Sequence, residues 1–170
     1  MSESTPTPEQ HRSSVWRWWS EIQTEDRAGR AELRRCATAA EVAFTAPYHR
    51  LLQRLGSRLN EGDARRVAAI AAVLAHIESE PGERASFARQ MGTPKAEGQA
   101  SVVSDARFRH LLRNEDPDEL LRELVRLVRQ LDRIAPVDAL FNDLMKWDER
   151  TRMRWARDFY QAAPMTKKSA

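Results

Sequence analysis

Arginine side chains recur at helical spacing in one segment of this 170-residue chain, between residues 117 and 135. Four of them fall on one face of the predicted helix, namely Arg122, Arg126, Arg129 and Arg133. The opposite face carries Leu120, Leu121, Leu124, Leu127, Val128 and Leu131. A guanidinium group presents five donors in a flat fork, which suits it to bind phosphate oxygens. Such a face is either solvated surface or one side of a polyanion-binding site.

Three further predicted helices repeat this arrangement. The arginines of the first are Arg27, Arg30 and Arg34, with Arg35 beside this stripe; those of the second are Arg109 and Arg113, and those of the third are Arg150, Arg154 and Arg157. One stripe alone is typical of solvated surface, whereas four stripes on helices that should pack side by side also fit a track for a polyanion. From the residues alone, the chain is a basic helical binding module with both interpretations open.

The sequence contains no recognisable catalytic or metal-binding pattern. The four histidines are His11, His49, His76 and His110, and none has a Cys, Asp or Glu at metal-ligand spacing. His76 borders an apolar helix and is interpreted as a core or boundary residue. No glycine-rich phosphate loop and no Gly-x-Ser-x-Gly turn occurs. We therefore expect a protein that is not an enzyme and uses no metal or cofactor.

The composition indicates a cytoplasmic protein with a mildly basic surface and no membrane partner. The net charge is +3, and four of the 28 basic residues are lysines, so a nucleic-acid site would have to come from folded patches. Cys36 is the only cysteine, which excludes an intrachain disulfide and suits a reducing compartment. The first fifteen residues do not resemble a secretory signal, and the longest uncharged apolar stretch, 67–77, is too short to cross a bilayer.

Helical periodicity runs through nearly the whole chain, and no strand pattern occurs. We predict an all-α fold of about eight to nine helices in two small helical bundles. The N-terminal bundle is expected in residues 1–84, with disordered first residues, and the C-terminal bundle in 104–163, followed by a disordered tail at 164–170. An irregular connecting loop at 85–103, interrupted by glycines and a proline, separates the two bundles.

Local signals predict several helix ends and part of the core. Three polar residues are expected N-caps, namely Ser104, Asp116 and Asp148. A capping box at 7–10 is expected to open the first helix, and Gly56 is expected to end another. In the first helix, Trp16 and Trp19 share a face with apolar residues and are expected in the core. Trp18 lies off that stripe and is expected to be available to an interface.

Several stretches, taken in order, resemble the small subunit of the type I-E CRISPR surveillance complex Cascade, the CasB family. The first stretches are a Trp-x-x-Trp segment, RAELRR at 30–35 and APYHRLLQRLG at 46–56. The later ones are SFARQMG at 86–92, RFRHLLR at 107–113, and VDALFNDLMKW followed by RMRWARDFY within 137–160. Each is ordinary helical sequence, so the resemblance depends on their order and spacing over roughly residues 15–160.

The resemblance implies a non-catalytic protein made of two small helical bundles. In that family, two copies lie beside the backbone subunits that hold the guide RNA, and near the large subunit. Their basic surface helps to hold the guide–target hybrid and the displaced strand. The implied partners are therefore guide RNA, target DNA, the other Cascade subunits and a second copy of the chain. The RNA–DNA hybrid is about as stable as the DNA duplex that it replaces, so contacts to the nucleic-acid backbone can shift the equilibrium of strand exchange.

Seven arginines are expected to bind nucleic acid, namely Arg34, Arg35, Arg65, Arg107, Arg109, Arg113 and Arg126. Arg109 and Arg113 follow from helix geometry, and the other five from the resemblance. Two further classes stay open, a helical DNA-binding transcriptional regulator and a structural adaptor. A regulator would need Asn or Gln on an exposed recognition helix, where this chain has arginine. In an adaptor, the arginines would pair with acidic neighbours.

Overall fold

The structure is a computed structural model that describes residues 12–56, 58–82 and 85–165. Ten helices occur in these residues: α1 (Ser14–Thr24), α2 (Arg27–Arg35), α3 (Ala39–Val42), α4 (Ala46–Leu55), α5 (Glu61–Ala75), α6 (Phe87–Gly92), α7 (Asp105–Arg113), α8 (Pro117–Gln130), α9 (Val137–Met145) and α10 (Glu149–Ala162). The described residues contain two isolated bridges and no β-strand, so the all-α prediction is confirmed. Predictions for residues 1–11 and 166–170 lie outside the described part.

Polar N-caps fix most helix starts, because a side-chain oxygen accepts one of the first free backbone N–H groups. The three predicted caps are all confirmed, namely Ser104, Asp116 and Asp148. Gly56 ends α4 with a φ of 61°, a left-handed conformation that glycine adopts without strain. Helix α1 begins at Ser14 with Ser13 as its cap. The capping box predicted at 7–10 lies outside the described residues, and the helix that carries Val15 begins at Ser14 and not at that box.

The tryptophans of α1 anchor the N-terminal helices. Trp18 is fully buried and donates its indole N–H to the carbonyl of Pro47 at 2.8 Å. Trp16 is only partly buried and donates its indole N–H to Glu80 at 2.9 Å. The buried stripe consists of Val15, Trp18, Trp19 and Ile22. The prediction for Trp18 was thus wrong, because the apolar face follows the i, i+3, i+4, i+7 pattern from Val15. Trp16 packs against the core, as predicted, but is only partly buried.

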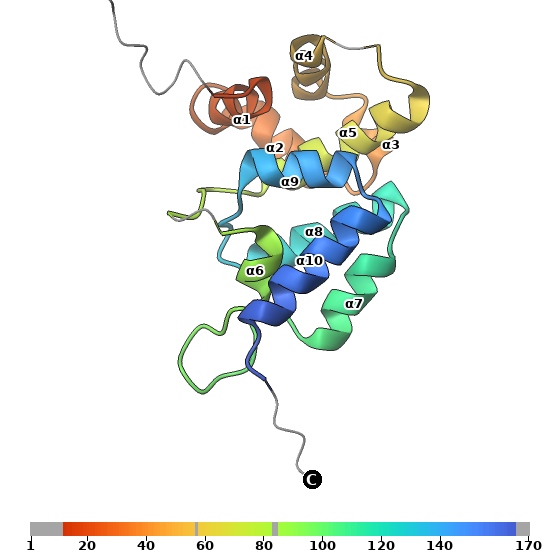
Figure 1. The fold of residues 1–170 in the computed structure, drawn as a ribbon. Helices are drawn as coiled ribbons and strands as arrows, with labels where there is room; N and C mark the ends of the chain where they lie inside the picture. The colour runs from red at the N-terminus through yellow and green to blue at the C-terminus, as the bar shows by residue number, and fades with distance from the viewer. Residues whose placement is uncertain (1–11, 57, 83–84, 166–170) are drawn as a thin grey trace, which may run out of the picture.

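Helix α5 lies at the centre of the packing. Every residue from Val67 to Ala75 is buried, and α2, α3, α8 and α9 all pack against this helix. Its alanines leave little side-chain volume between the helix axes, so the neighbouring helices approach closely. Figure 1 shows α9 crossing between the N-terminal helices above it and the helices α8 and α10 below it. The arginine stripes of α2 and α8 therefore belong to helices that share one buried neighbour.

A second close contact joins α6 to α10. A β-carbon at Gly92 would overlap the carbonyl oxygen of Phe159, so these two backbones can approach this closely only with glycine. The ring of Phe159 stacks on Phe108 of α7, with centroids 4.0 Å apart and planes inclined by 5°. Trp155 of α10 packs against Phe87 of α6. These aromatic contacts hold α6, α7 and α10 together.

The predicted irregular segment at 85–103 contains helix α6 and a closed loop. An antiparallel bridge between Pro94 and Ser101 closes the loop, and Gly98 turns it with a φ of 77°. Buried apolar side chains form one continuous cluster with members from both sides of this segment. The division of the chain into two bundles at residues 84 and 103 stays a prediction.

Candidate nucleic-acid interface

The arginines fall into two groups, according to whether a carboxylate neutralises them. Ten form ion pairs with described carboxylates: Arg12, Arg50, Arg54, Arg65, Arg107, Arg109, Arg133, Arg152, Arg154 and Arg157. A second group has no described carboxylate within ion-pair distance and includes Arg27, Arg34, Arg35, Arg113, Arg122, Arg126 and Arg129. Only the second group can offer its full charge to a ligand without first losing a partner.

Arg107 joins α7 to α8. Its Nε donates to Glu123 Oε1 at 2.9 Å, and its Nη1 donates to Gln130 Oε1 at 3.3 Å. Glu123 is buried on α8, and a buried carboxylate is unfavourable without a partner. The structure therefore gives this predicted site residue a role in holding two helices together.

Arg65 and Arg109 also have carboxylate partners. Arg65 Nη2 lies 2.9 Å from Asp118 Oδ2, a contact that joins α5 to the start of α8. Asp118 also accepts the backbone N–H of Ala39 at 2.7 Å, and this bond, with Arg65, lowers the pKa of the carboxyl group. Arg109 Nε lies 3.3 Å from Asp105 Oδ2, one turn earlier on α7. Both side chains of this last pair are more than half exposed, so the pair is weak.

The other four predicted site residues carry charges that no described carboxylate neutralises. Arg35 is the last residue of α2, Arg113 is the last residue of α7, and Arg126 lies on the outer face of α8. All three are exposed, and Arg34 is half-buried beside Arg35. The seven predicted residues are thus distributed over α2, α5, α7 and α8, and Arg34 and Arg35 are neighbours in the sequence of α2.

The charges of four arginines, which come from three segments, act on His76, the C-cap of α5. Arg30 and Arg34 come from α2, Arg129 comes from α8, and Arg133 comes from the turn after α8. His76 is 2% exposed. Burial and these four arginines lower the pKa of His76 to about 4, so its ring is neutral at pH 7. We call these five residues the His76 cluster, and through it the arginine stripes of α2 and α8 meet.

The sequence of residues 29–160 matches the family of the CRISPR-associated protein Cse2. The chain belongs to the Cse2 family. The match includes every member of the His76 cluster and all seven predicted site residues. No curated protein matches the sequence significantly.

Two solved structures share the fold of this Cse2-family chain. A chain of E. coli Cascade bound to a PAM-containing double-stranded DNA target matches with a TM-score of 0.69 at 18% identity, over 89% of this chain and 97% of that one. CasB from Thermus thermophilus matches with a TM-score of 0.61 at 21% identity, over 92% of this chain and 100% of that one. The shared fold thus extends over nearly the whole length of both relatives.

Sequence reasoning identifies the stripes of this Cse2-family chain but not the His76 cluster. Arg30 belongs to the predicted stripe of α2, and Arg129 and Arg133 belong to that of α8. Spacing along one helix does not show which helices meet, so the convergence of the stripes is visible only in three dimensions. One signal was available: a polar residue, His76, ends the most apolar helix and must lie near whatever packs there.

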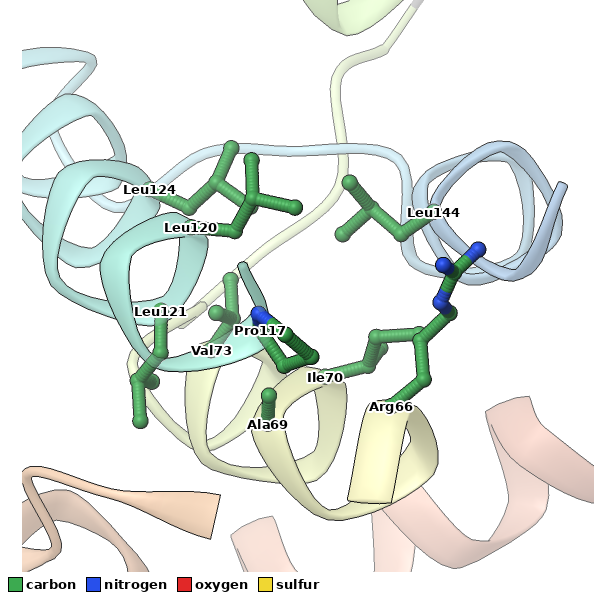
Figure 2. A pocket seen from close by; sticks show the side chains of 9 residues that line it. All are labelled: Arg66, Ala69, Ile70, Val73, Pro117, Leu120, Leu121, Leu124 and Leu144. Atoms are coloured by element: carbon green, nitrogen blue, oxygen red, sulfur yellow. The ribbon is translucent and has the colours of Figure 1, made fainter. Parts of the chain in front are cut away.

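The apolar space between α5, α8 and α9 of the Cse2-family chain is too small for a ligand. Figure 2 shows Ile70, Leu124 and Leu144 around this space, with Arg66 at its edge. Its volume of about 10 Å³ is at the lower limit for a single water molecule. In the described part of the chain, no cluster of His, Cys, Asp and Glu could hold a metal ion. Among the described helices, none is long and apolar enough to cross a membrane.

Proposed function

We propose that this protein is a non-catalytic subunit of the type I-E CRISPR RNA-guided complex Cascade, and that it binds nucleic-acid backbones without reading their sequence. The observation that carries the proposal is the Cse2-family match over residues 29–160. The similar E. coli structure is of Cascade bound to a DNA target, so we propose the same class of ligand here. The proposed partners are guide RNA, target DNA, the backbone and large subunits, and a second copy of the chain, in the cytoplasm.

Backbone binding suits the strand exchange that an RNA-guided complex performs. The RNA–DNA hybrid is about as stable as the DNA duplex that it replaces, so contacts to the phosphates can shift the balance. Contacts to phosphate carry no sequence information, which suits a subunit that must accept any guide. Arginine serves this purpose because its donors match the phosphate oxygens. The proposed role is to hold the guide–target hybrid and the displaced strand.

The principal contacts are the predicted arginines whose charges no described carboxylate neutralises, namely Arg34, Arg35, Arg113 and Arg126. The other three would first have to leave a carboxylate, namely Arg65, Arg107 and Arg109. For Arg107 this would leave the charge of Glu123 buried without a partner, which is strongly unfavourable. We therefore assign Arg107 a smaller share in nucleic-acid binding than its place in the matched segment RFRHLLR implies.

Reconstitution of Cascade with and without this chain tests the proposed function. The affinity of each complex for a duplex that matches the guide is measured by filter binding at one salt concentration. We expect the chain to co-purify with the complex and to tighten target binding by about tenfold or more, because several phosphate contacts are added. Equal affinity of both complexes, or failure of the chain to co-purify, would show that the proposal is wrong.

The two alternative classes give different results with the isolated chain. Phosphate binding predicts weak, sequence-independent binding of single strands that falls steeply with salt, as measured by fluorescence anisotropy. Tight binding to one palindromic duplex would indicate a transcriptional regulator. Absence of binding at low salt would indicate a structural adaptor.

A further inference from the structure

The His76 cluster gathers more positive charge than the neighbouring acid neutralises. Its four guanidinium groups face one nearby carboxylate, that of Glu78, whose Oε1 lies 3.6 Å from Arg133 Nε. The pKa of Arg30 is lowered, chiefly by burial and then by repulsion from Arg34. Cations that repel one another are unfavourable to hold together, and a bound anion would relieve this repulsion.

On the side of α2, the protein surface at the cluster forms a hollow. The residues that line this surface hollow are Gln23, Arg27, Arg30, Ala31 and Arg34. Arg30 is fixed there, because its Nε donates to the carbonyl of Ala75 at 3.0 Å and its Nη2 to that of Ile77 at 3.4 Å. Gln23 Nε2 donates to the same Ile77 carbonyl at 2.6 Å. The backbone carbonyls of Ala75 and Ile77 therefore already accept hydrogen bonds from side chains. The groups that the hollow offers to an anion are N–H donors.

Two polar atoms of the cluster are buried and have no hydrogen-bond partner among the described residues. They are Nδ1 of His76 and Nη1 of Arg133. Buried polar atoms are nearly always paired, and an unpaired one costs roughly 1–3 kcal/mol. A phosphate oxygen accepts hydrogen bonds from a guanidinium group and from a neutral imidazole N–H alike. These two atoms therefore leave the hydrogen-bonding capacity of the cluster incomplete.

A constrained turn presents Arg133 to the cluster. Asp132 and Arg133 both have positive φ, of 57° and 61°, which is unusual for residues other than glycine. The backbone carbonyl of Arg133 accepts the N–H of Glu78 at 2.8 Å, and Ala135 N–H donates to the carbonyl of Ser79 at 3.1 Å. These bonds tie the turn after α8 to the segment after α5, so the position of Arg133 next to His76 is fixed by the backbone.

We propose that the hollow of the His76 cluster is a binding site for one phosphate group, held by Arg30 and Arg34, which line the hollow, and favoured by the charges of Arg129 and Arg133. The phosphate belongs to a nucleic-acid backbone or is free phosphate. The first source rests on the proposed function, whereas phosphate binding itself does not. The site fixes one phosphate at the junction of three segments, while exposed arginines such as Arg126 contact a backbone without fixing its position.

The imidazole ring of His76 reports directly on an anion in the cluster. The charged groups that face it are Arg30 and Arg34 from α2, Arg129 from α8, Arg133 from the turn, and Glu78 beyond α5. An anion among them favours the imidazolium form. By proton NMR at constant ionic strength, we expect saturating inorganic phosphate to raise the pKa of His76 from about 4 to about 5. The ring resonances of exposed His49 on α4, a helix without predicted site residues, serve as the internal control and should not move.

Matched variants test whether the arginines are responsible. Arg34→Gln removes a donor that lines the hollow and should weaken phosphate binding about fivefold or more, because a charge-assisted hydrogen bond is lost. Arg129→Gln removes a charge of the cluster on α8 and should weaken binding by a smaller factor. Arg150→Gln makes the same change at an exposed arginine of α10 that has no described carboxylate partner, and it should leave binding unchanged. Thermal unfolding of each variant establishes that the protein is folded.

The same titration with a single-stranded oligonucleotide that lacks terminal phosphates distinguishes the two sources. A saturable response of His76 to the oligonucleotide identifies a nucleic-acid backbone as the ligand, and a response to inorganic phosphate alone identifies free phosphate. No response of the folded protein to either ligand, or equal weakening in Arg150→Gln, overturns the site. If the oligonucleotide binds by anisotropy while His76 responds to neither ligand, the site is wrong and the proposed function stands. A phosphate response without any nucleic-acid binding supports the site and contradicts the proposed function.

Discussion

Arg107 and Arg126 lie on amphipathic helices of the same protein, yet their charges serve different purposes. The guanidinium group of Arg107 neutralises the buried carboxylate of Glu123, whereas Arg126 is exposed and has no described carboxylate partner. An arginine that already neutralises a buried carboxylate cannot bind a phosphate instead without destabilising the fold. The carboxylates around each arginine therefore decide its role more than its position in a stripe does.

Substitution of Arg107 should measure this structural role. Arg107→Ala should lower the free energy of unfolding by about 2 kcal/mol, because the charge of Glu123 stays buried without a partner. Arg126→Ala is the matched control and should change it by less than about 0.5 kcal/mol. Both values come from urea unfolding. Addition of Glu123→Gln to Arg107→Ala should restore part of the loss, and a loss that stays unchanged in this double variant would contradict the explanation.

His76 should make stability depend on pH. Its pKa is lowered from 6.5 to about 4 in the folded chain, so the unfolded chain binds a proton first as the pH falls. The free energy of unfolding should therefore decrease below pH 6.5 and, for this residue, be about 2 kcal/mol lower at about pH 5 than at neutral pH. Urea unfolding over this range measures the slope, and His76→Gln should reduce it. The same slope in His76→Gln as in the unchanged chain would exclude His76 as its cause.

Among the helices, close packing depends on small residues at two places. The buried alanines of α5 bring four neighbouring helices close to one axis, and Gly92 brings α6 onto the backbone of α10. The first contact brings the stripes of α2 and α8 to one buried helix. The second holds α10 beside α6, with the rings of Phe108 and Phe159 stacked next to it.

Two glycine substitutions separate close packing from helix propensity. Gly92→Ala places a methyl group against the carbonyl of Phe159 and should lower the free energy of unfolding by about 2–3 kcal/mol. Gly62→Ala changes a glycine near the start of α5 that has ordinary space around it, so it should be neutral or stabilise the protein by up to about 1 kcal/mol. Thermal unfolding of both variants gives the comparison. Similar losses in both would show that the overlap at Phe159 is relieved by a small movement.

Over the whole molecule, features that depend on neighbouring residues were predictable from the sequence, and features that depend on distant ones were not. The caps at Ser104 and Asp116 and the helix end at Gly56 are local, and all are confirmed. The burial of Trp18 depends on a carbonyl 29 residues away. The pairing of Arg107 with Glu123 and the convergence on His76 likewise depend on which helices meet. Charge spacing therefore located basic faces, but it could not show which charges are neutralised.

The central claim is that arginines without carboxylate partners on α2 and α8 bind nucleic-acid backbone within Cascade. Its most direct test is the salt dependence of target binding by the reconstituted complex, measured between about 50 and 200 mM salt. The complex with the unchanged chain is compared with one that contains the double variant Arg35→Ala/Arg126→Ala, and with a control that carries Arg54→Ala, which removes an arginine already paired with Glu21. Each lost phosphate contact should reduce the slope of log K against log salt by about 0.7–0.9. We predict weaker binding for every target sequence and a slope shallower by about 1.5 with the double variant only. Equal affinities and equal slopes in all three complexes would contradict the claim.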